Sequence, residues 1–88
     1  MIVWTDYLRY RAGLRGFNLA EIESILQSST ERYVATITGR NVVVGRHGAS
    51  LVMVPYDVSG EDIVPLTIHA TTRQQINFRI KSGRFRYG

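Results

Sequence analysis

Apolar residues recur at helical spacing near the start of the chain and predict a first helix. Tyr7, Tyr10 and Leu14 are separated by three and four positions, so they share one stripe of a helix. Thr5 and Asp6 are both residue types that accept hydrogen bonds from the free N–H groups of a first helical turn. We therefore predict a helix that begins at Thr5 or Asp6 and runs through Leu14.

A capping-box pattern predicts a second helix. Asn18 is followed three residues later by Glu21, the spacing at which the two residues cap each other's backbone N–H groups. Turn-forming Ser and Thr residues place the end of this helix near Gln27. Its predicted buried face consists of Leu19, Ile22, Ile25 and Leu26.

The apolar period then changes to two, which is typical of strands. Residues 33–37 and 42–44 are predicted to form a hairpin around a turn at residues 38–41. A second turn leads into residues 51–56, which are apolar throughout. We expect this strand to lie in the centre of the sheet with both of its faces covered.

The last predicted strand covers residues 63–70 and follows a predicted polar loop at residues 57–62. Pro65 cannot donate a hydrogen bond to a neighbouring strand, which favours a sheet edge or a bulge at this point. Strict alternation assigns Val64, Leu66 and Ile68 to one face of the strand, and Pro65, Thr67 and His69 to the other.

A third helix is predicted after Thr71 or Thr72, either of which can cap it. Ile76 and Ile80 form its inward stripe, and its other side consists of Arg73, Asn77, Lys81 and Arg84. The order is helix, helix, four mainly antiparallel strands in a meander, and helix. This order predicts a single α+β domain over residues 1–88, with the helices in a layer over one sheet.

The charge of the chain is carried almost entirely by arginine, with ten Arg and one Lys and a net charge of +4. A guanidinium binds two phosphate oxygens at once, so this bias favours a nucleic-acid partner, although a general preference for arginine codons gives the same ratio. The chain has no Cys, which excludes disulfides and thiolate zinc sites and favours a reducing compartment. No window approaches the ~20 apolar residues of a membrane span. We expect a cytoplasmic protein with no membrane partner.

The basic residues are concentrated at the end of the chain. Residues 63–88 contain five basic side chains and no carboxylate. These side chains are Arg73, Arg79, Lys81, Arg84 and Arg86. His69 ends the last predicted strand beside the N-terminus of the third helix, which favours anions, and its pKa range suits proton exchange near neutral pH. We predict an anion-binding surface around a titratable group; the alternative is a solvated strand-end histidine.

Other motifs narrow the chemistry. Arg84, Phe85, Arg86 and Tyr87 alternate basic and aromatic side chains, as in single-stranded RNA binding, or else the two aromatic rings pack the tail onto the body. His47 is expected to be a polar turn residue. No metal-ligand, Walker or dinucleotide motif is present, so no metal site and no cofactor are expected. The chemistry left to a His, several Arg and a Tyr is RNA cleavage by attack of a ribose 2′-hydroxyl on the adjacent phosphate.

Three sequence phrases resemble the small toxins of the RelE/ParE superfamily, especially its BrnT-type branch. Residues 4–6, Trp-Thr-Asp, resemble the Trp-Asp opening of BrnT-type chains. Residues 15–18, Arg-Gly-Phe-Asn, resemble the junction between their first two helices, and residues 71–73, Thr-Thr-Arg, resemble the start of their last helix. The phrases occur in the same order as in the family, and nearly the whole chain takes part.

The resemblance implies a RelE-like fold and a metal-independent endoribonuclease that inhibits translation and is made beside an antitoxin that covers its site. By position it assigns Arg11, Arg15 and Arg73 to recurring basic positions of the family. Arg15 stands where BrnT-type chains commonly have His. His69 and Tyr87 are our own inference, because the catalytic groups vary between branches of the family.

The resulting hypothesis is a toxin-like endoribonuclease of a type II toxin–antitoxin pair, acting on RNA that includes mRNA on the ribosome. Its predicted catalytic residues are His69, Arg73 and Tyr87. Its predicted phosphate-binding residues are Arg11, Arg15, Arg73, Lys81, Arg84 and Arg86. Two alternatives stay open: a non-catalytic module that binds nucleic acid or protein on a toxin-like scaffold, and a gyrase inhibitor as in the ParE branch.

Overall fold

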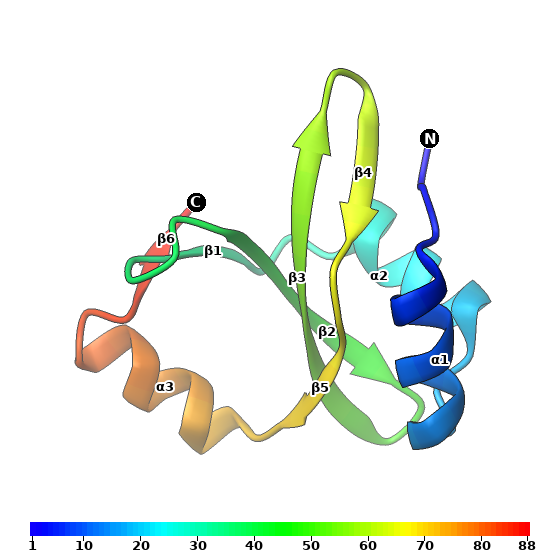
Figure 1. The fold of residues 1–88 in the computed structure, drawn as a ribbon. Coiled ribbons are helices and arrows are strands. Elements are labelled where there is room, and N and C mark those ends of the chain that lie inside the picture. Colours follow the sequence, from blue (N-terminus) through cyan, green and yellow to red (C-terminus); the bar gives the residue numbers. More distant parts are fainter.

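Three helices lie around an antiparallel sheet in the computed structural model, which describes residues 1–88 (Figure 1). The α+β class, the three helices and the antiparallel sheet are confirmed, but the sheet has six strands where four were predicted. In chain order the elements are α1 (Asp6–Arg15), α2 (Leu19–Ser28), β1 (Arg32–Ala35), β2 (Asn41–His47), β3 (Ser50–Ser59), β4 (Asp62–Pro65), β5 (His69–Thr71), α3 (Arg73–Lys81) and β6 (Phe85–Tyr87).

Local capping explains where the helices begin. The side-chain oxygens of Thr5, Asn18 and Thr72 each accept a hydrogen bond from a backbone N–H group in the first turn of α1, α2 and α3. All three are among the predicted caps. Helix α1 ends at Arg15 because Gly16 adopts a left-handed conformation with φ of 71°.

The sheet has the order β4-β3-β2-β1-β6, and β5 also pairs with β3. All of these strand pairs are antiparallel. Strand β3 is central, as predicted, because β2 occupies one of its edges while β4 and β5 share the other. The predicted strand over residues 63–70 is therefore two short strands with an interruption between them.

The interruption is a β-bulge opposite Pro55. Pro65 of β4 pairs with Tyr56, whereas His69 of β5 pairs with Met53, so four steps along one strand correspond to three along the other. Pro55 accepts a hydrogen bond from the next residue after β4 but has no N–H to return one, which weakens the ladder at this point. The bulge that Pro65 suggested is thus present.

The bulge changes which side chains share a face. Before it, Pro65 is buried on the same side of the sheet as its partner Tyr56; after it, Ile68 is buried on that side as well. His69 consequently faces the other side, together with Leu66. The predicted alternation is wrong here because the extra residue reverses the order of the two faces.

The predicted polar loop at residues 57–62 is also wrong. Strands β3 and β4 continue as a hairpin that projects from the body, closed at Gly60, whose φ is 61° (Figure 1). Polar side chains on this arm face solvent while the backbone groups pair across the ladder, so polarity does not interrupt the strands. The outer edge of β4 is covered by the start of the chain through a parallel bridge between Ile2 and Ile63.

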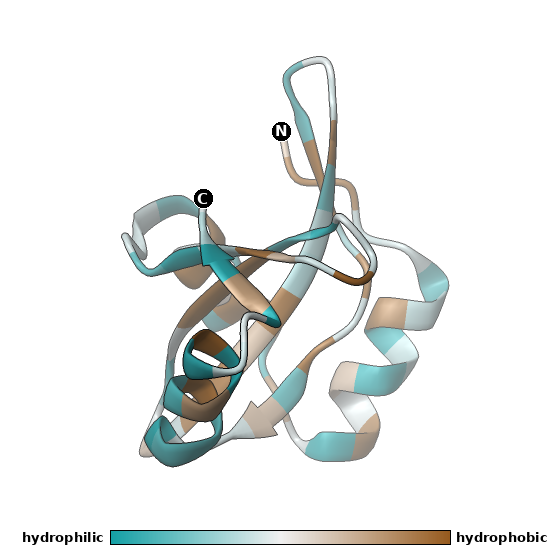
Figure 2. Ribbon diagram, turned by 90° about the vertical axis from the view of Figure 1, so that its left-hand side faces the viewer, coloured by the Kyte–Doolittle hydropathy of each residue, from teal (hydrophilic) through white to brown (hydrophobic).

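Each face of the sheet carries its own apolar core. The α1/α2 core consists of Leu8, Ala12, Ile22, Ile25, Leu26, Val43, Val52, Val54, Tyr56 and Ile68. The α3 core consists of Tyr33, Val42, Val44, Leu51, Ile76 and Phe85. Adjacent strand positions belong to different cores, so α3 lies on the opposite face from α1 and α2. The predicted single helical layer is wrong, because the apolar central strands need cover on both faces. Figure 2 shows hydrophobic positions along these strands and hydrophilic positions on the outward-facing sides of the helices.

Helix α1 presents two different apolar stripes. Leu8 and Ala12 are buried, whereas Tyr7, Tyr10 and Leu14 are 57%, 65% and 65% exposed. The stripe seen in the sequence therefore faces solvent. None of the three helices is long and apolar enough to cross a membrane.

The C-terminal tail forms β6, which the sequence did not predict. Helix α3 ends at Lys81, Gly83 turns the chain with φ of 78°, and Phe85–Tyr87 pairs with β1. Arg84 accordingly lies in the turn after the helix and not on a helical face. The tail thus extends the sheet beyond β1.

Candidate anion-binding groove

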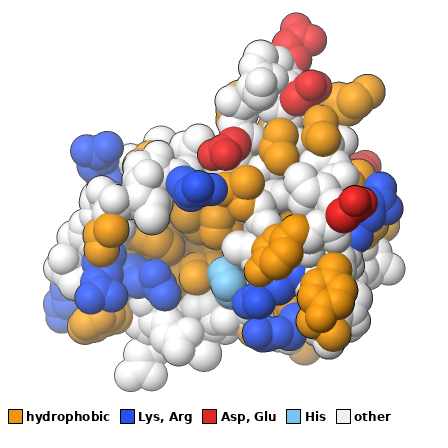
Figure 3. Space-filling view, in the orientation of Figure 1, with side chains coloured by type: hydrophobic (Ala, Val, Ile, Leu, Met, Phe, Trp, Pro, Cys, Tyr) orange, Lys and Arg blue, Asp and Glu red, His pale blue; other side chains and the backbone are white.

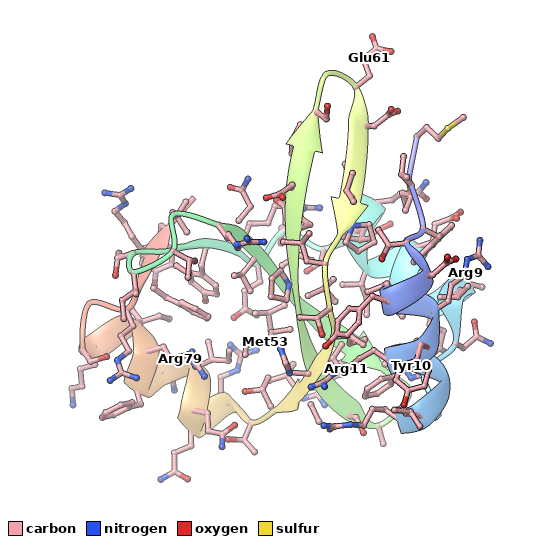
Figure 4. All side chains as sticks on the ribbon, in the orientation of Figure 1. Arg9, Tyr10, Arg11, Met53, Glu61 and Arg79 are labelled. Carbon is pink, nitrogen blue, oxygen red and sulfur yellow. The ribbon has the colours of Figure 1, made fainter.

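A groove lies on the α3 face of the sheet, where the helix leaves part of that face uncovered. It consists of a larger cavity of about 860 Å³ and a smaller one of about 330 Å³. Both cavities are lined by Met53, His69 and Arg79, and we call the two together the His69 groove. Figure 4 shows how Arg79 on α3 and Arg11 on α1 lie on either side of Met53 in this view.

The charged side chains that line the His69 groove are all positive. Arg79 and Arg84 line the larger cavity, Arg40 lines the smaller one, and no Asp or Glu lines either. The one carboxylate paired with these arginines is that of Asp57, 4.0 Å from the Arg40 guanidinium, and both side chains are about half exposed. Figure 3 shows a histidine at a hollowed surface with Lys and Arg side chains on both sides of it. An anion entering the larger cavity is attracted by Arg79 and Arg84, neither of which is paired with a carboxylate.

Arg79 is held at the junction of the two cavities. Its guanidinium carbon lies 5.3 Å from the centre of the Phe85 ring, and that ring is stacked on Tyr33 with centroids 5.3 Å apart. Arg79 forms no ion pair with a carboxylate. The side chain is therefore positioned by an aromatic face while its N–H donors stay available for a ligand.

Arg79 belongs to the basic segment in which an anion-binding surface was predicted, but it was not among the predicted catalytic or phosphate-binding residues, although the sequence contains a signal for it. It follows Ile76 by three positions and precedes Ile80 by one, which places it at the border of the inward stripe of α3. A basic residue at such a border lies beside the sheet and not in open solvent. Grouping the basic residues by the outward face of the helix missed this position.

His69 is brought into the groove by the bulge and is contacted there by Arg11. The Nη2 atom of Arg11 lies 3.3 Å from Nδ1 of His69. A guanidinium can only donate, so Nδ1 must accept, and the ring is neutral with its proton on Nε2. His69 in this state offers the groove a hydrogen-bond donor and has no free lone pair.

The surroundings of His69 favour this neutral state. Partial burial, followed by the positive charges of Arg11, Arg15 and Arg79, lowers the pKa of His69 from its ordinary value of 6.5. Of the predicted site residues, Arg11 contacts His69 and the charge of Arg15 acts on that ring, but neither side chain lines the cavities. Arg84, a third predicted phosphate-binding residue, lines the larger cavity.

Arg73 does not reach the groove. Its guanidinium forms a bidentate ion pair with Glu31, with N–O distances of 2.5 and 2.9 Å. The hydrogen bond from Arg73 holds the pKa of the Glu31 carboxyl below its usual range, and Tyr33 donates a second hydrogen bond at 2.7 Å. The prediction that Arg73 joins His69 is wrong, because the carboxylate at the start of β1 binds it first. The start of α3 also has one fewer free N–H group for an anion than predicted, because the N–H of Gln75 donates to the side chain of Thr72.

The remaining predicted residues are dispersed. Tyr87 is 74% exposed and lies beside Tyr33, with ring centroids 5.5 Å apart, but lines neither cavity. Arg86 pairs with Val34 and is adjacent to Phe85 in β6. Its side chain therefore points away from the face of the sheet that carries Phe85 and the groove. Lys81, at the end of α3, also lines neither cavity. Of the two aromatic tail residues, Phe85 packs onto the body, as one of the two interpretations held.

His47 is the last residue of β2 and not the polar turn residue that was expected, because its ring packs against the start of α2. Its Nε2 accepts the backbone N–H of Asn18 at 2.7 Å, and its Nδ1 lies 3.0 Å from the carboxylate of Glu21. The ring packs edge-on against Phe17 with centroids 5.0 Å apart. Both ring nitrogens are therefore occupied in joining the start of α2 to the end of β2.

No group of three or more His, Asp or Glu side chains comes together in the structure as a metal site would require. Comparisons with protein-family models, with curated proteins and with solved structures each found no match to the chain. The resemblance to RelE/ParE toxins therefore stays a prediction.

Proposed function

We propose that this protein binds RNA in the His69 groove and cleaves it as a toxin-like, metal-independent endoribonuclease of a type II toxin–antitoxin pair. The observation that carries the proposal is the lining of the groove, which contains His69, Arg40, Arg79 and Arg84 and no carboxylate. The order of two helices, four or more antiparallel strands and a third helix supports a RelE-like layout, although β6 follows that helix. The contact between Arg11 and His69 adds a further guanidinium beside the groove, which supports phosphate binding.

Phosphate binding follows from the donors that converge on the groove. Arg79 and Arg84 present guanidinium groups to the larger cavity, and a neutral His69 adds its Nε2–H group. Charge-assisted hydrogen bonds to phosphate oxygens are stronger than neutral ones. The same groups would stabilise the additional negative charge that develops on the phosphoryl oxygens when a 2′-hydroxyl attacks.

Proton transfer would require Arg11 to move. Cleavage needs an acceptor for the 2′-hydroxyl proton and a donor for the leaving 5′ oxygen. Nδ1 of His69 becomes an acceptor only when Arg11 leaves it, and a phosphate in the groove offers that guanidinium a stronger, charged partner. The 2′ oxygen would then pass its proton to Nδ1 and form a bond to phosphorus. The bond to the 5′ oxygen would break as that oxygen takes a proton from Nε2 of the resulting imidazolium, leaving a 2′,3′-cyclic phosphate and a 5′-hydroxyl end.

The test is incubation of the purified chain with single-stranded RNA in the presence of EDTA, with analysis of the product ends. We expect cyclic phosphate and 5′-hydroxyl products, and a rate at least about 100-fold lower in His69→Ala, as for loss of a general acid or base. Arg79→Gln should also slow cleavage. Arg86→Gln is the matched control, because it removes the same charge from the opposite face of the sheet. DNA of the same sequence should bind but stay intact, since it lacks the attacking hydroxyl.

A second candidate function is RNA binding without cleavage. It is favoured by the Arg11 donor on the one lone pair of His69, and by the absence of Arg73 and Tyr87 from the groove. RNA binding that weakens in Arg79→Gln, with no cyclic-phosphate products under any condition, would select this function. Cleavage that survives both His69→Ala and Arg79→Gln would contradict the groove as the site of either function.

An antitoxin that covers this groove must present carboxylates to it. A partner that covers the groove would remove water from the arginines that line the cavities. Carboxylates of the partner would replace the stabilisation that this water gives to the guanidinium groups. A short acidic segment encoded by the neighbouring gene is therefore the expected partner. Co-purification of the two proteins, weakened by high salt and by Arg79→Gln, would support the pairing.

A further inference from the structure

The smaller cavity of the His69 groove differs in character from the larger one. It holds about 330 Å³, at the lower end of the roughly 300–1,000 Å³ of small-molecule sites. Apolar side chains make up more than half of its lining, namely Ala35, Val42, Met53, Pro55, Leu66 and Phe85. These residues come from four neighbouring strands and the bulge, so the cavity is a concave apolar surface at the centre of the sheet.

One polar group in this cavity has no partner in the protein. The hydroxyl oxygen of Thr67 is buried and forms no hydrogen bond. Thr67 lies in the bulge, where no ladder partner is available on β3. A buried hydroxyl is normally hydrogen-bonded, because an unmade bond costs the full desolvation of the group. The wall of the cavity therefore combines apolar surface with one unused donor and acceptor, which lies just beneath that surface.

The two cavities adjoin at His69 and Arg79, which line both. A ligand that spans them would place an anion against Arg79 and Arg84 and an uncharged group against Met53 and Thr67. A nucleotide has this arrangement, with a phosphate and a flat ring whose faces are apolar and whose edge is polar. The volume of the smaller cavity is sufficient for one base.

From this arrangement we propose that the smaller cavity binds one unpaired nucleobase of the RNA whose phosphate lies at Arg79. The inference rests on the proposed RNA binding and adds the position of the base. One face of the base lies against Met53 and Pro55, and its edge hydrogen-bonds to the hydroxyl of Thr67 once that side chain turns toward the cavity. Such a site requires single-stranded RNA, because a paired base has neither its edge nor its faces free.

The experiment compares two oligonucleotides of equal length and charge, a 10-nucleotide single-stranded RNA and its fully abasic counterpart, both with 2′-O-methyl groups so that neither can be cleaved. Fluorescence anisotropy at low salt gives the dissociation constant of each for the full-length chain. We expect the RNA with bases to bind on the order of tenfold tighter, as for one base held against protein side chains. Equal affinities would overturn the base site while leaving phosphate binding intact.

Three variants separate the base site from the phosphate site. Thr67→Val removes the hydroxyl with little change of shape, and it should weaken binding of the normal RNA more than binding of the abasic one. Arg79→Gln should weaken both, and Arg86→Gln should change neither. If no oligonucleotide binds the wild-type chain, both the base site and the proposed function fail. Loss of base preference in Arg86→Gln but not in Thr67→Val would place the base elsewhere and overturn the proposal.

Discussion

The guanidinium of Arg11 on α1 lies 3.3 Å from Nδ1 of His69 on β5, fifty-eight residues further along the chain. The contact joins the first helix to the strand that leads into the third. It also determines the chemistry of the imidazole, because the donor occupies the one lone pair of the neutral ring. The Nε atom of Arg11 is buried and has no hydrogen-bond partner. The contact through Nη2 is therefore the hydrogen bond that holds the guanidinium in place.

Arg11→Gln should raise the pKa of His69. The variant removes the nearest positive charge, which is second only to burial in lowering that pKa from 6.5. The change should be partial, since burial and the charges of Arg15 and Arg79 remain. Nitrogen-detected NMR titration of the ring measures it, with His47→Asn to assign the two histidines. Wild-type spectra should show the proton on Nε2; a proton on Nδ1 would contradict the contact.

The same lowered pKa predicts how stability depends on acid. The unfolded chain takes up a proton at about pH 6.5, before the folded chain does. The contribution of His69 is therefore fully present above pH 6.5 and is lost as the pH falls through its folded pKa. Urea unfolding of wild type and His69→Gln between pH 7 and pH 5 should show a smaller decline in the variant.

Tyr33 should make the fold sensitive to alkali. Burial, with the hydrogen bond to Glu31, raises the pKa of Tyr33 from 10.0 to about 12. The folded chain then keeps its phenol proton where the unfolded chain loses it, so stability is complete below pH 10 and declines as the pH rises toward 12. The decline should reach at most about 2–3 kcal/mol, at roughly 1.4 kcal/mol per pKa unit. It should be smaller in Tyr33→Phe and unchanged in Tyr10→Phe, which alters an exposed ring.

Replacement of His47 should destabilise the start of α2. His47→Ala leaves the N–H of Asn18 without its acceptor and removes the partner of Glu21. We expect a loss of about 1–3 kcal/mol in the free energy of unfolding, measured with urea. Glu21→Gln should cost less, because the half-exposed amide can still accept a hydrogen bond from Nδ1. Equal stability of His47→Ala and wild type would show that the ring does not join α2 to β2.

Gly45 is required by the close approach of β2 to α2. A Cβ at this position would lie 2.8 Å from Cγ2 and 3.0 Å from Cγ1 of Ile25. Because both atoms branch from the root of a buried side chain, they cannot swing away, and Gly45→Ala should cost about 1–3 kcal/mol. The penalty should shrink in an Ile25→Ala background, since that change removes both atoms. A double-mutant cycle by urea unfolding checks this, and an additive result would refute the clash.

The starts of the three helices and the central position of β3 could be predicted from the sequence. Thr5, Asn18 and Thr72 act on N–H groups two or three residues away, so the pattern that predicts a cap contains both partners. The apolar run of β3 likewise requires cover on both faces, wherever that cover comes from. Ile76 and Ile80 were placed correctly on the inner side of α3 for the same local reason.

The groove depended on contacts between distant parts of the chain. The bulge that places His69 in the groove arises opposite Pro55, on a neighbouring strand. Arg73 follows the predicted start of a helix, yet Glu31, forty-two residues earlier, removes it from the site. The sequence showed that basic residues are available for a site. It did not show which arginines lie near His69, because their positions depend on residues that only the strand register brings close.

The sequence alone determined where helices start, which strands are buried and that the C-terminal part of the chain is basic, because each property depends on residues within a few positions of one another. The tertiary structure decided which arginines meet His69 and which meet a carboxylate. That choice follows from one extra residue opposite Pro55 and from the face on which α3 packs, since both change the direction of side chains without changing the local pattern.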